Sequence, residues 1–213
     1  MAPSLPPGSV ELRADCGRCA ALCCIGLSFD ASPQFALSKP AGTRCPHLSR
    51  TERCTIHAAR VERGFAGCVA YDCLGAGQRV TQELFQGRSP SSEPELLAPM
   101  LHAFSRLRAL HELLQLLETA RRLPLDAVAQ QRAQALYRQV DDACVAPPVE
   151  EAGELARLTR LVGDFLRTLR GLPYLATRPV SQSGSSGAGP EPFVALAALT
   201  SQASLPRRTG RSI

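Results

Sequence analysis

Cysteine is the residue type in this chain whose number and spacing could support chemistry. Eight of the nine cysteines fall within residues 16–73, as a Cys-x2-Cys pair, an adjacent pair and four single residues: Cys16, Cys19, Cys23, Cys24, Cys45, Cys54, Cys68 and Cys73. Two thiolates from one tight turn can bind a single cation, and four thiolates make a closed zinc site or hold an iron–sulfur cluster. The pattern therefore predicts that these eight residues bind zinc or iron, with an iron–sulfur cluster as one form of the iron.

The sequence leaves the pairing of these ligands open. Neighbouring side chains point apart in a strand and lie about 100° apart in a helix, so Cys23 and Cys24 need not bind the same ion. Eight thiols could fill two four-ligand sites, or one site with the other thiols in structural roles. His47 and His57 lie within three residues of a cysteine and are secondary candidate ligands. No catalytic residue and no organic cofactor is predicted.

Three other interpretations of the cysteines are open. Buried cysteines can act as small hydrophobic residues, which is the preferred interpretation of Cys144 on its predicted helix. Disulfides are a second interpretation, disfavoured because the N-terminus lacks the apolar segment of a signal peptide. A third is thiol–disulfide exchange by Cys16 and Cys19, but such a motif normally opens a helix within a βαβ unit, and the sequence shows no such unit.

Composition and charge restrict the expected cellular compartment of the protein and the classes of partner that it could bind. The sequence has no run of 18 apolar residues, so no membrane span is predicted, and the cytoplasm is the expected compartment. The net charge of +5 comes from 24 basic and 19 acidic residues that are interspersed along the chain. Without a concentrated basic stripe, neither nucleic acid nor a membrane is an expected partner.

The two halves of the chain differ in their predicted secondary structure. Residues 1–12 are expected to be a disordered lead-in. Residues 13–79 combine the cysteines with frequent glycines and show poor apolar periodicity. Such a segment buries little apolar surface, so it is predicted to be a small irregular module that needs a metal to keep its shape. Residues 80–92 are expected to be a polar linker.

Residues 93–173 are predicted to be helical. Apolar residues recur at steps of three and four from Leu97 to Leu117, which is the pattern of one buried helix face. Ser92 and Glu95 resemble a capping box at the start of this helix, and Pro124 ends it.

Two further helices follow in the sequence. One is predicted from residues 126 to 144, with Val128, Leu136 and Val140 on one side, and another from about 150 to 170. Residues 174–213 are rich in Ser, Gly and Pro and are expected to be mostly disordered. The predicted fold class is mainly α: an irregular, Cys-rich, metal-bound module, then an antiparallel three-helix bundle, then a disordered C-terminal tail.

The cysteine motif resembles the zinc- or iron-chelating (YkgJ-type, CxxCxxxCC) domain. That family opens with the clustered motif, continues with Cys-x-x-Leu and Cys-x-Ile-Tyr, and usually has Arg-Pro-x-x-Cys afterwards. The matching segments here are Cys16 to Cys24, Cys45 to Leu48, and Cys54 to His57, with histidine in place of the tyrosine. The last motif is replaced by Arg63-Gly-Phe-Ala-Gly-Cys68, and Cys73 is an additional candidate. The resemblance implies metal chelation and no known reaction.

A second resemblance, over about residues 11–172, is to the N-terminal region of certain actinobacterial pentapeptide-repeat proteins. The segments that carry it are Arg13 to Cys19, Lys39 to Gly42, Arg63 to Cys68, Tyr71 to Cys73, Gly75 to Gln78, and Leu110 to Leu114. In those proteins a run of repeats forms a right-handed β-helix. The sequence contains no such run, so a β-helix is not expected here.

Two functional hypotheses follow. The first is a metal-stabilised binding module, in which the helices of residues 93–173 contact a protein partner or a second copy of the chain. The second is an iron–sulfur redox protein or enzyme component. Asp15, Asp30 and Asp72 are as typical of turns and caps as of catalysts, so the sequence assigns no reaction.

Overall fold

A computed structural model describes residues 10–145 and 152–170, so most of the predicted lead-in and the tail at 174–213 lie outside the described residues. Within the described ranges every regular element is a helix. The elements in chain order are η1 (Cys16–Arg18), α1 (Leu22–Gly26), α2 (Ala66–Ala70), α3 (Ala76–Arg79), η2 (Val80–Leu84), η3 (Pro94–Leu96), α4 (Leu97–Arg121), α5 (Ala127–Val145) and α6 (Ala152–Leu169).

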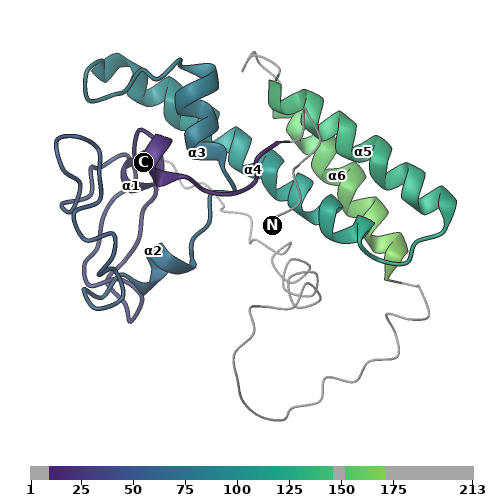
Figure 1. Cartoon of the computed structure of the whole chain (residues 1–213), viewed down its shortest axis with the longest axis horizontal. Coiled ribbons are helices and arrows are strands. Elements are labelled where there is room, and N and C mark those ends of the chain that lie inside the picture. Colours follow the sequence, from purple (N-terminus) through teal and green to yellow (C-terminus); the bar gives the residue numbers. More distant parts are fainter. Residues whose placement is uncertain (1–9, 146–151, 171–213) are drawn as a thin grey trace, which may run out of the picture.

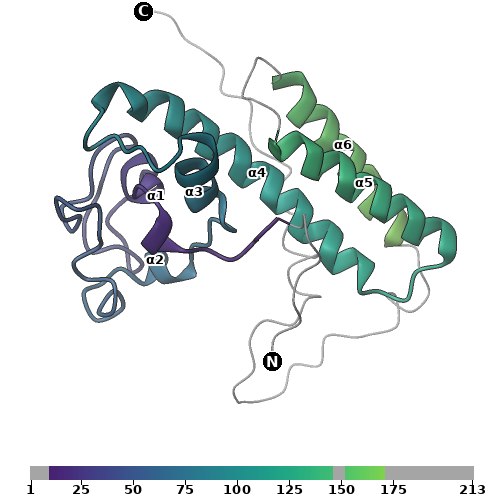
Figure 2. The ribbon, with the colours of Figure 1, turned by 45° about the horizontal axis from the view of Figure 1, so that its top comes forward.

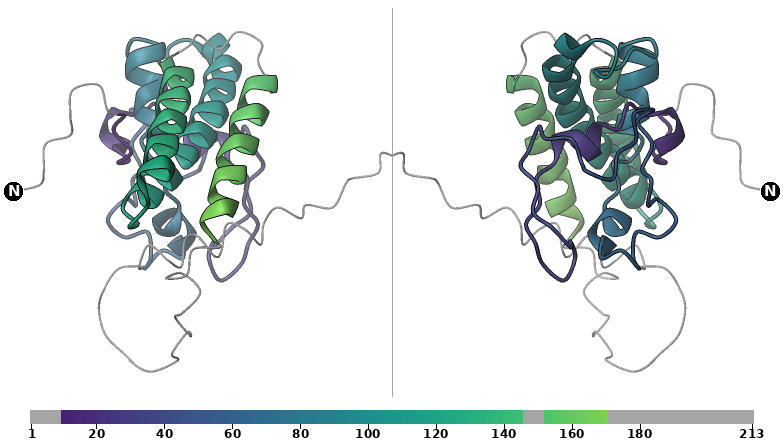
Figure 3. Two further views of the ribbon diagram at one scale, coloured as in Figure 1. Left: turned by 90° about the vertical axis from the view of Figure 1, so that its right-hand side faces the viewer. Right: turned by 90° about the vertical axis from the view of Figure 1, so that its left-hand side faces the viewer.

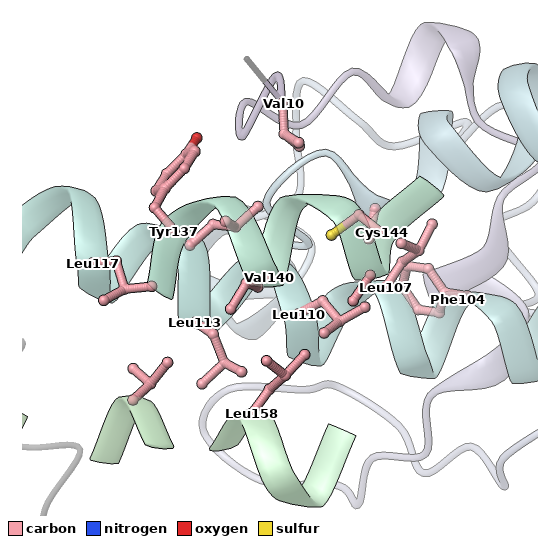
Figure 4. Packing of buried hydrophobic residues seen from close by; sticks show 14 of the residues in the cluster. Val10, Phe104, Leu107, Leu110, Leu113, Leu117, Tyr137, Val140, Cys144 and Leu158 are labelled. Carbon is pink, nitrogen blue, oxygen red and sulfur yellow. The ribbon is translucent and has the colours of Figure 1, made fainter. Parts of the chain in front are cut away.

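The three long helices α4, α5 and α6 pack side by side around an apolar core (Figures 1 and 3). Leu110 of α4, Val140 of α5 and Leu158 of α6 are each at most 1% exposed and face one another (Figure 4). The predicted mainly helical fold class and its packed helical region are confirmed. None of the helices in the described ranges has the length and apolar character needed to cross a lipid bilayer.

Local signals explain where the long helices begin, with two corrections. Asp126 Oδ1 accepts a hydrogen bond from the Ala129 N–H at 2.8 Å, which caps α5. The predicted capping box at Ser92 is wrong, because its hydroxyl donates to the Ser89 carbonyl at 3.0 Å and the turn η3 precedes α4. The prediction that Val128 shares one side of the helix with Leu136 and Val140 is also wrong, because those two are buried and Val128 is not. Its side chain is 76% exposed, since the buried stripe of α5 starts only at Ala133.

The segment from residue 27 to residue 64 has no helix and no extended strand, only isolated bridges such as the pair Leu48 and Cys54. The rings of Phe29 and Phe35 stack with centroids 4.3 Å apart, yet neither side chain is fully buried. The predicted irregular, Cys-rich region is confirmed. Figures 1 and 2 place it at one end of the molecule, beside α3 and the first half of α4, with α5 and α6 at the other end.

A few N-terminal side chains extend the core of the long helices toward the cysteines. Val10, Leu22, Ala76 and Val80 are buried and belong to the same hydrophobic cluster as α4, α5 and α6. Leu22 lies on α1 between two groups of cysteines, and Ala76 opens α3. The helical core therefore fixes α1 and α3, and it leaves the irregular segment to be held by other contacts.

Gly75 ties the N-terminal segment to the start of α3, and we expect Gly75→Ala to destabilise the protein by about 3 kcal/mol. Gly75 has φ +79°, and an added Cβ would lie 2.2 Å from the Glu11 carbonyl oxygen. Gly87→Ala is the matched control, because Gly87 has φ +78° but open space around the Cβ position. The free energy of unfolding of this control should fall by about 1 kcal/mol. Urea unfolding of both variants measures the difference, and equal losses would contradict the proposed contact.

Candidate metal centre

Cys19 and Cys73 lie together over the first turn of α3. A Cβ atom placed on Gly77 would be 2.7 Å from the Cys19 Sγ and 3.8 Å from the Cys73 Sγ. The absence of a side chain at Gly77 is what allows both thiols to approach this helix. Cys16 begins the turn η1, whose first N–H groups are capped when Asp15 Oδ1 accepts from the Gly17 N–H at 2.8 Å. Two sequence-predicted ligands are thus brought onto one surface, with a third in the adjoining turn.

Polar side chains of α3 and η2 hold this cysteine-bearing segment in place. Gln78 accepts from the Asp15 N–H at 2.9 Å and donates to the Arg13 carbonyl at 2.7 Å. The Thr81 hydroxyl accepts from the Ala20 N–H at 2.9 Å and donates to the Gly77 carbonyl at 2.9 Å. Both side chains are buried, and sequence reasoning assigned them no role. The run Gly75 to Gln78 in the resemblance to pentapeptide-repeat proteins was the available signal for Gln78.

Cys23 and Cys24 are consecutive residues of α1, and their sulfur atoms are 3.9 Å apart. A hydrogen bond between the two sulfurs raises the pKa of Cys23 and lowers the pKa of Cys24. Positive charge from Lys39 and Arg60 lowers the pKa of Cys24 further, against the effect of burial. Cys24 is therefore the thiol of this pair that more readily becomes a thiolate, the form that binds metals.

Short backbone links connect Cys24 to the cysteines of the irregular segment. The Cys45 N–H donates to the Cys24 carbonyl at 3.1 Å, and the Leu48 N–H donates back to the Cys45 carbonyl at 3.0 Å. Leu48 also forms a bridge with Cys54. Cys68 lies on α2, where its carbonyl accepts from Arg60 at 3.2 Å. These contacts gather four more of the predicted ligands into one region.

Lys39 is the basic group buried in this region. Its ammonium nitrogen donates to the carbonyls of Ile25 at 3.0 Å, Pro40 at 3.1 Å and Thr43 at 2.8 Å. Burial lowers the pKa of Lys39, and the neighbouring thiols of Cys45 and Cys24 oppose that change. Sequence reasoning missed this residue as part of the site, although Lys39 is the single lysine of the chain.

The remaining candidates occupy other surroundings. The ring of His47 packs edge-on against Phe65 with centroids 4.9 Å apart, and the side chain of His57 is exposed. Cys144 is 1% exposed and lies in the core between α4 and α5 (Figure 4), as the interpretation of an inert, buried cysteine requires.

All nine cysteines lie in the part of the chain that the structure describes, and all are free thiols there. Within residues 10–145 and 152–170, no three Cys, His, Asp or Glu side chains already stand in an arrangement that would hold a metal ion. The metal-ligand assignments therefore stay predictions. A site of this kind would have to form when the ion binds.

A buried histidine joins the cysteine region to α4. His111 is fully buried, its Nδ1–H donates to the Leu74 carbonyl at 2.5 Å, and its Nε2 lies 3.5 Å from the Arg79 guanidinium. Sequence reasoning placed it on a helix face without a role. Leu74 directly follows Cys73, so this bond fixes the chain beside a predicted ligand.

We expect His111 to make the protein less stable in acid. Burial is the main cause that lowers the pKa of His111 from 6.5 to about 4; the hydrogen bond to Leu74 opposes this change, and the charge of Arg79 adds to it. The unfolded chain therefore takes up the proton first as pH falls, and stability present above pH 6.5 is lost progressively toward pH 4. This shift corresponds to about 3 kcal/mol. Urea unfolding between pH 7 and pH 4 should show that the free energy of unfolding falls less steeply with pH in His111→Asn than in the wild type. Equal pH dependence in the two proteins would contradict this role of His111.

The amino-acid sequence is similar to that of YybG from Bacillus subtilis (strain 168), which is described as uncharacterized. The two are 33% identical over 160 residues, a match that covers 75% of this chain and 52% of YybG. The chain thus spans about half the length of that relative. No protein-family model and no solved structure matches the chain. The chain is a distant homologue of YybG, and that relationship brings no activity with it.

Proposed function

We propose that residues 13–79 form a metal-binding module in which cysteine thiolates hold zinc or iron. One observation carries this proposal: between Leu27 and Gly64 the single buried side chain is Lys39. A segment of that length, with one partly buried aromatic stack and only isolated bridges, needs another source of order. Cys45 and Cys54 lie within it and Cys24 and Cys68 flank it, which is where crosslinking ions would replace the missing core.

The chemistry of the donors fits this role. Thiolates are the preferred ligands of structural zinc and of iron–sulfur clusters, and structural zinc contributes on the order of 10 kcal/mol to small modules. The resemblance of the Cys16 to Cys24 motif to the YkgJ-type chelating domain points the same way. The eight cysteines are the proposed ligands, and the packing of His47 against Phe65 favours a structural role for that residue.

We propose a binding module rather than a catalyst. Asp15 caps η1 and Asp72 Oδ1 accepts from the Leu74 N–H at 2.7 Å, so the two aspartates next to the thiols already have structural roles. In this account the metal fixes the irregular segment against α3 and α4. The proposed partner, a cytoplasmic protein or a second copy of the chain, contacts the helical residues 93–173.

Metal analysis of the full-length chain tests the proposal. Protein purified without oxygen should contain zinc or iron by mass spectrometry of the elements. A zinc protein is colourless, whereas an iron–sulfur protein absorbs near about 400 nm. Cys144→Ala is the matched control and should keep the full metal content, because Cys144 lies in the helical core. Protein that holds neither metal when freshly prepared would overturn the proposal.

A further inference from the structure

Building on the proposed metal binding, we propose that the eight thiols form two separate four-thiolate sites that meet at Cys23 and Cys24. The helix-side set is Cys16, Cys19, Cys23 and Cys73. The loop set is Cys24, Cys45, Cys54 and Cys68. Each set would hold one tetrahedral ion or one cluster, so the module binds two.

Packing distinguishes the two sets. Cys19, Cys23 and Cys73 pack against the hydrophobic cluster that continues into α4, α5 and α6. Cys19 and Cys73 also share the surface of α3 over Gly77, and Cys16 belongs to the same Cys-x2-Cys turn as Cys19. The helix-side set therefore rests on rigid elements that the apolar core fixes.

The loop set is assembled by backbone contacts of the irregular segment instead. The Cys45 N–H donates a backbone hydrogen bond to the Cys24 carbonyl at 3.1 Å. Cys54 forms a bridge with Leu48, whose N–H donates to the Cys45 carbonyl. Arg60 links Cys68 to the neighbourhood of Cys54. Its Nη1 donates to the Cys68 carbonyl at 3.2 Å, and its Nε donates to the carbonyl of His57 at 2.8 Å. The His57 N–H in turn donates to the Cys54 carbonyl at 3.3 Å.

Cys23 and Cys24 form the boundary between the two sets. Consecutive helical residues project about 100° apart, so these two side chains can each turn toward a different set. Their sulfur contact of 3.9 Å in α1 makes the two sites immediate neighbours. An adjacent cysteine pair is thereby explained as a junction, a role that a single four-ligand site would not require.

Zinc stoichiometry of paired variants tests the division. Full-length protein is reduced, freed of metal and reloaded with Zn²⁺, and bound zinc is counted by mass spectrometry. We expect two equivalents in the wild type and one in Cys19→Ala/Cys73→Ala or Cys45→Ala/Cys54→Ala. The cross-set control Cys19→Ala/Cys54→Ala should impair both sites. One equivalent in the wild type, or loss of both from either within-set pair, would overturn the division. No zinc in the wild type would instead overturn the proposed function.

A second measurement counts the sites in the wild type and uses two single variants to assign them. Protein loaded with ¹¹³Cd²⁺ should give two cadmium resonances of all-sulfur coordination. Cys23→Ser should shift mainly one resonance and Cys24→Ser mainly the other. A single resonance from the fully loaded wild type would contradict two sites, as would equal shifts of both resonances in each variant.

Discussion

Removal of bound metal should unfold residues 27–64 and leave α4, α5 and α6 folded. Lys39 is the only fully buried side chain of this segment, so little apolar burial is left to hold it once the crosslinks are lost. The loss corresponds to about 10 kcal/mol of metal-dependent folding free energy. Hydrogen exchange followed by mass spectrometry, before and after treatment with a chelator and a reductant, should show amides of this segment exchanging at nearly unfolded rates.

The helices should keep their protection in the same experiment. Leu110, Val140 and Leu158 are each at most 1% exposed in the core formed by the three long helices. Chelator already saturated with zinc is the control, and it should change nothing. Unchanged protection of residues 27–64 after metal removal would show that the segment is held by other means.

Lys39→Met should lower the free energy of unfolding of the irregular segment by about 2–4 kcal/mol. The ammonium group donates to three carbonyls from Ile25 to Thr43, and these would lose a charged donor. It also lies 5.6 Å from the centroid of the Phe29 ring. Methionine keeps the apolar stem but has no donor, so it isolates the contribution of the ammonium group.

The same substitution should speed the release of metal from the loop set. Thiolates around a divalent ion carry excess negative charge, and Lys39 raises the electrostatic potential at Cys24 and Cys45. Transfer of zinc to a coloured chelator measures the rate. Lys39→Arg keeps the charge and should show the smaller rate increase, although its guanidinium cannot reproduce all three bonds. Equal release rates for Lys39→Met and the wild type would exclude this electrostatic role.

The helical half could be predicted from sequence because its determinants are local. The apolar stripe from Leu97 to Leu117 and the cap at Asp126 act within a few residues, and helix packing needed only these signals. The two wrong predictions, the capping box at Ser92 and the placement of Val128, concern the first turns of helices, where the surrounding structure decides which side chains are capped or buried. Val128 has an apolar side chain, but it lies in the first turn of α5 before the buried stripe begins.

The arrangement of the cysteine region could not be predicted in the same way, because its contacts join distant parts of the chain. Gln78 and Thr81 hold residues about sixty positions earlier, and His111 bonds to Leu74 from another helix. Spacing identified the eight thiols as one group but could not divide them. The proposed division rests on Gly77 and on the backbone links around Cys45, and neither has a local sequence signal.

X-ray absorption at the metal edge of the purified protein would show whether thiolates hold the ion, because it counts the atoms bound to the ion. Thiolate coordination predicts about four sulfur neighbours per ion at about 2.3 Å, for zinc as for iron. A shell made mainly of nitrogen and oxygen at about 2.0–2.2 Å would contradict it, since the cysteines of residues 16–73 would then not be the ligands.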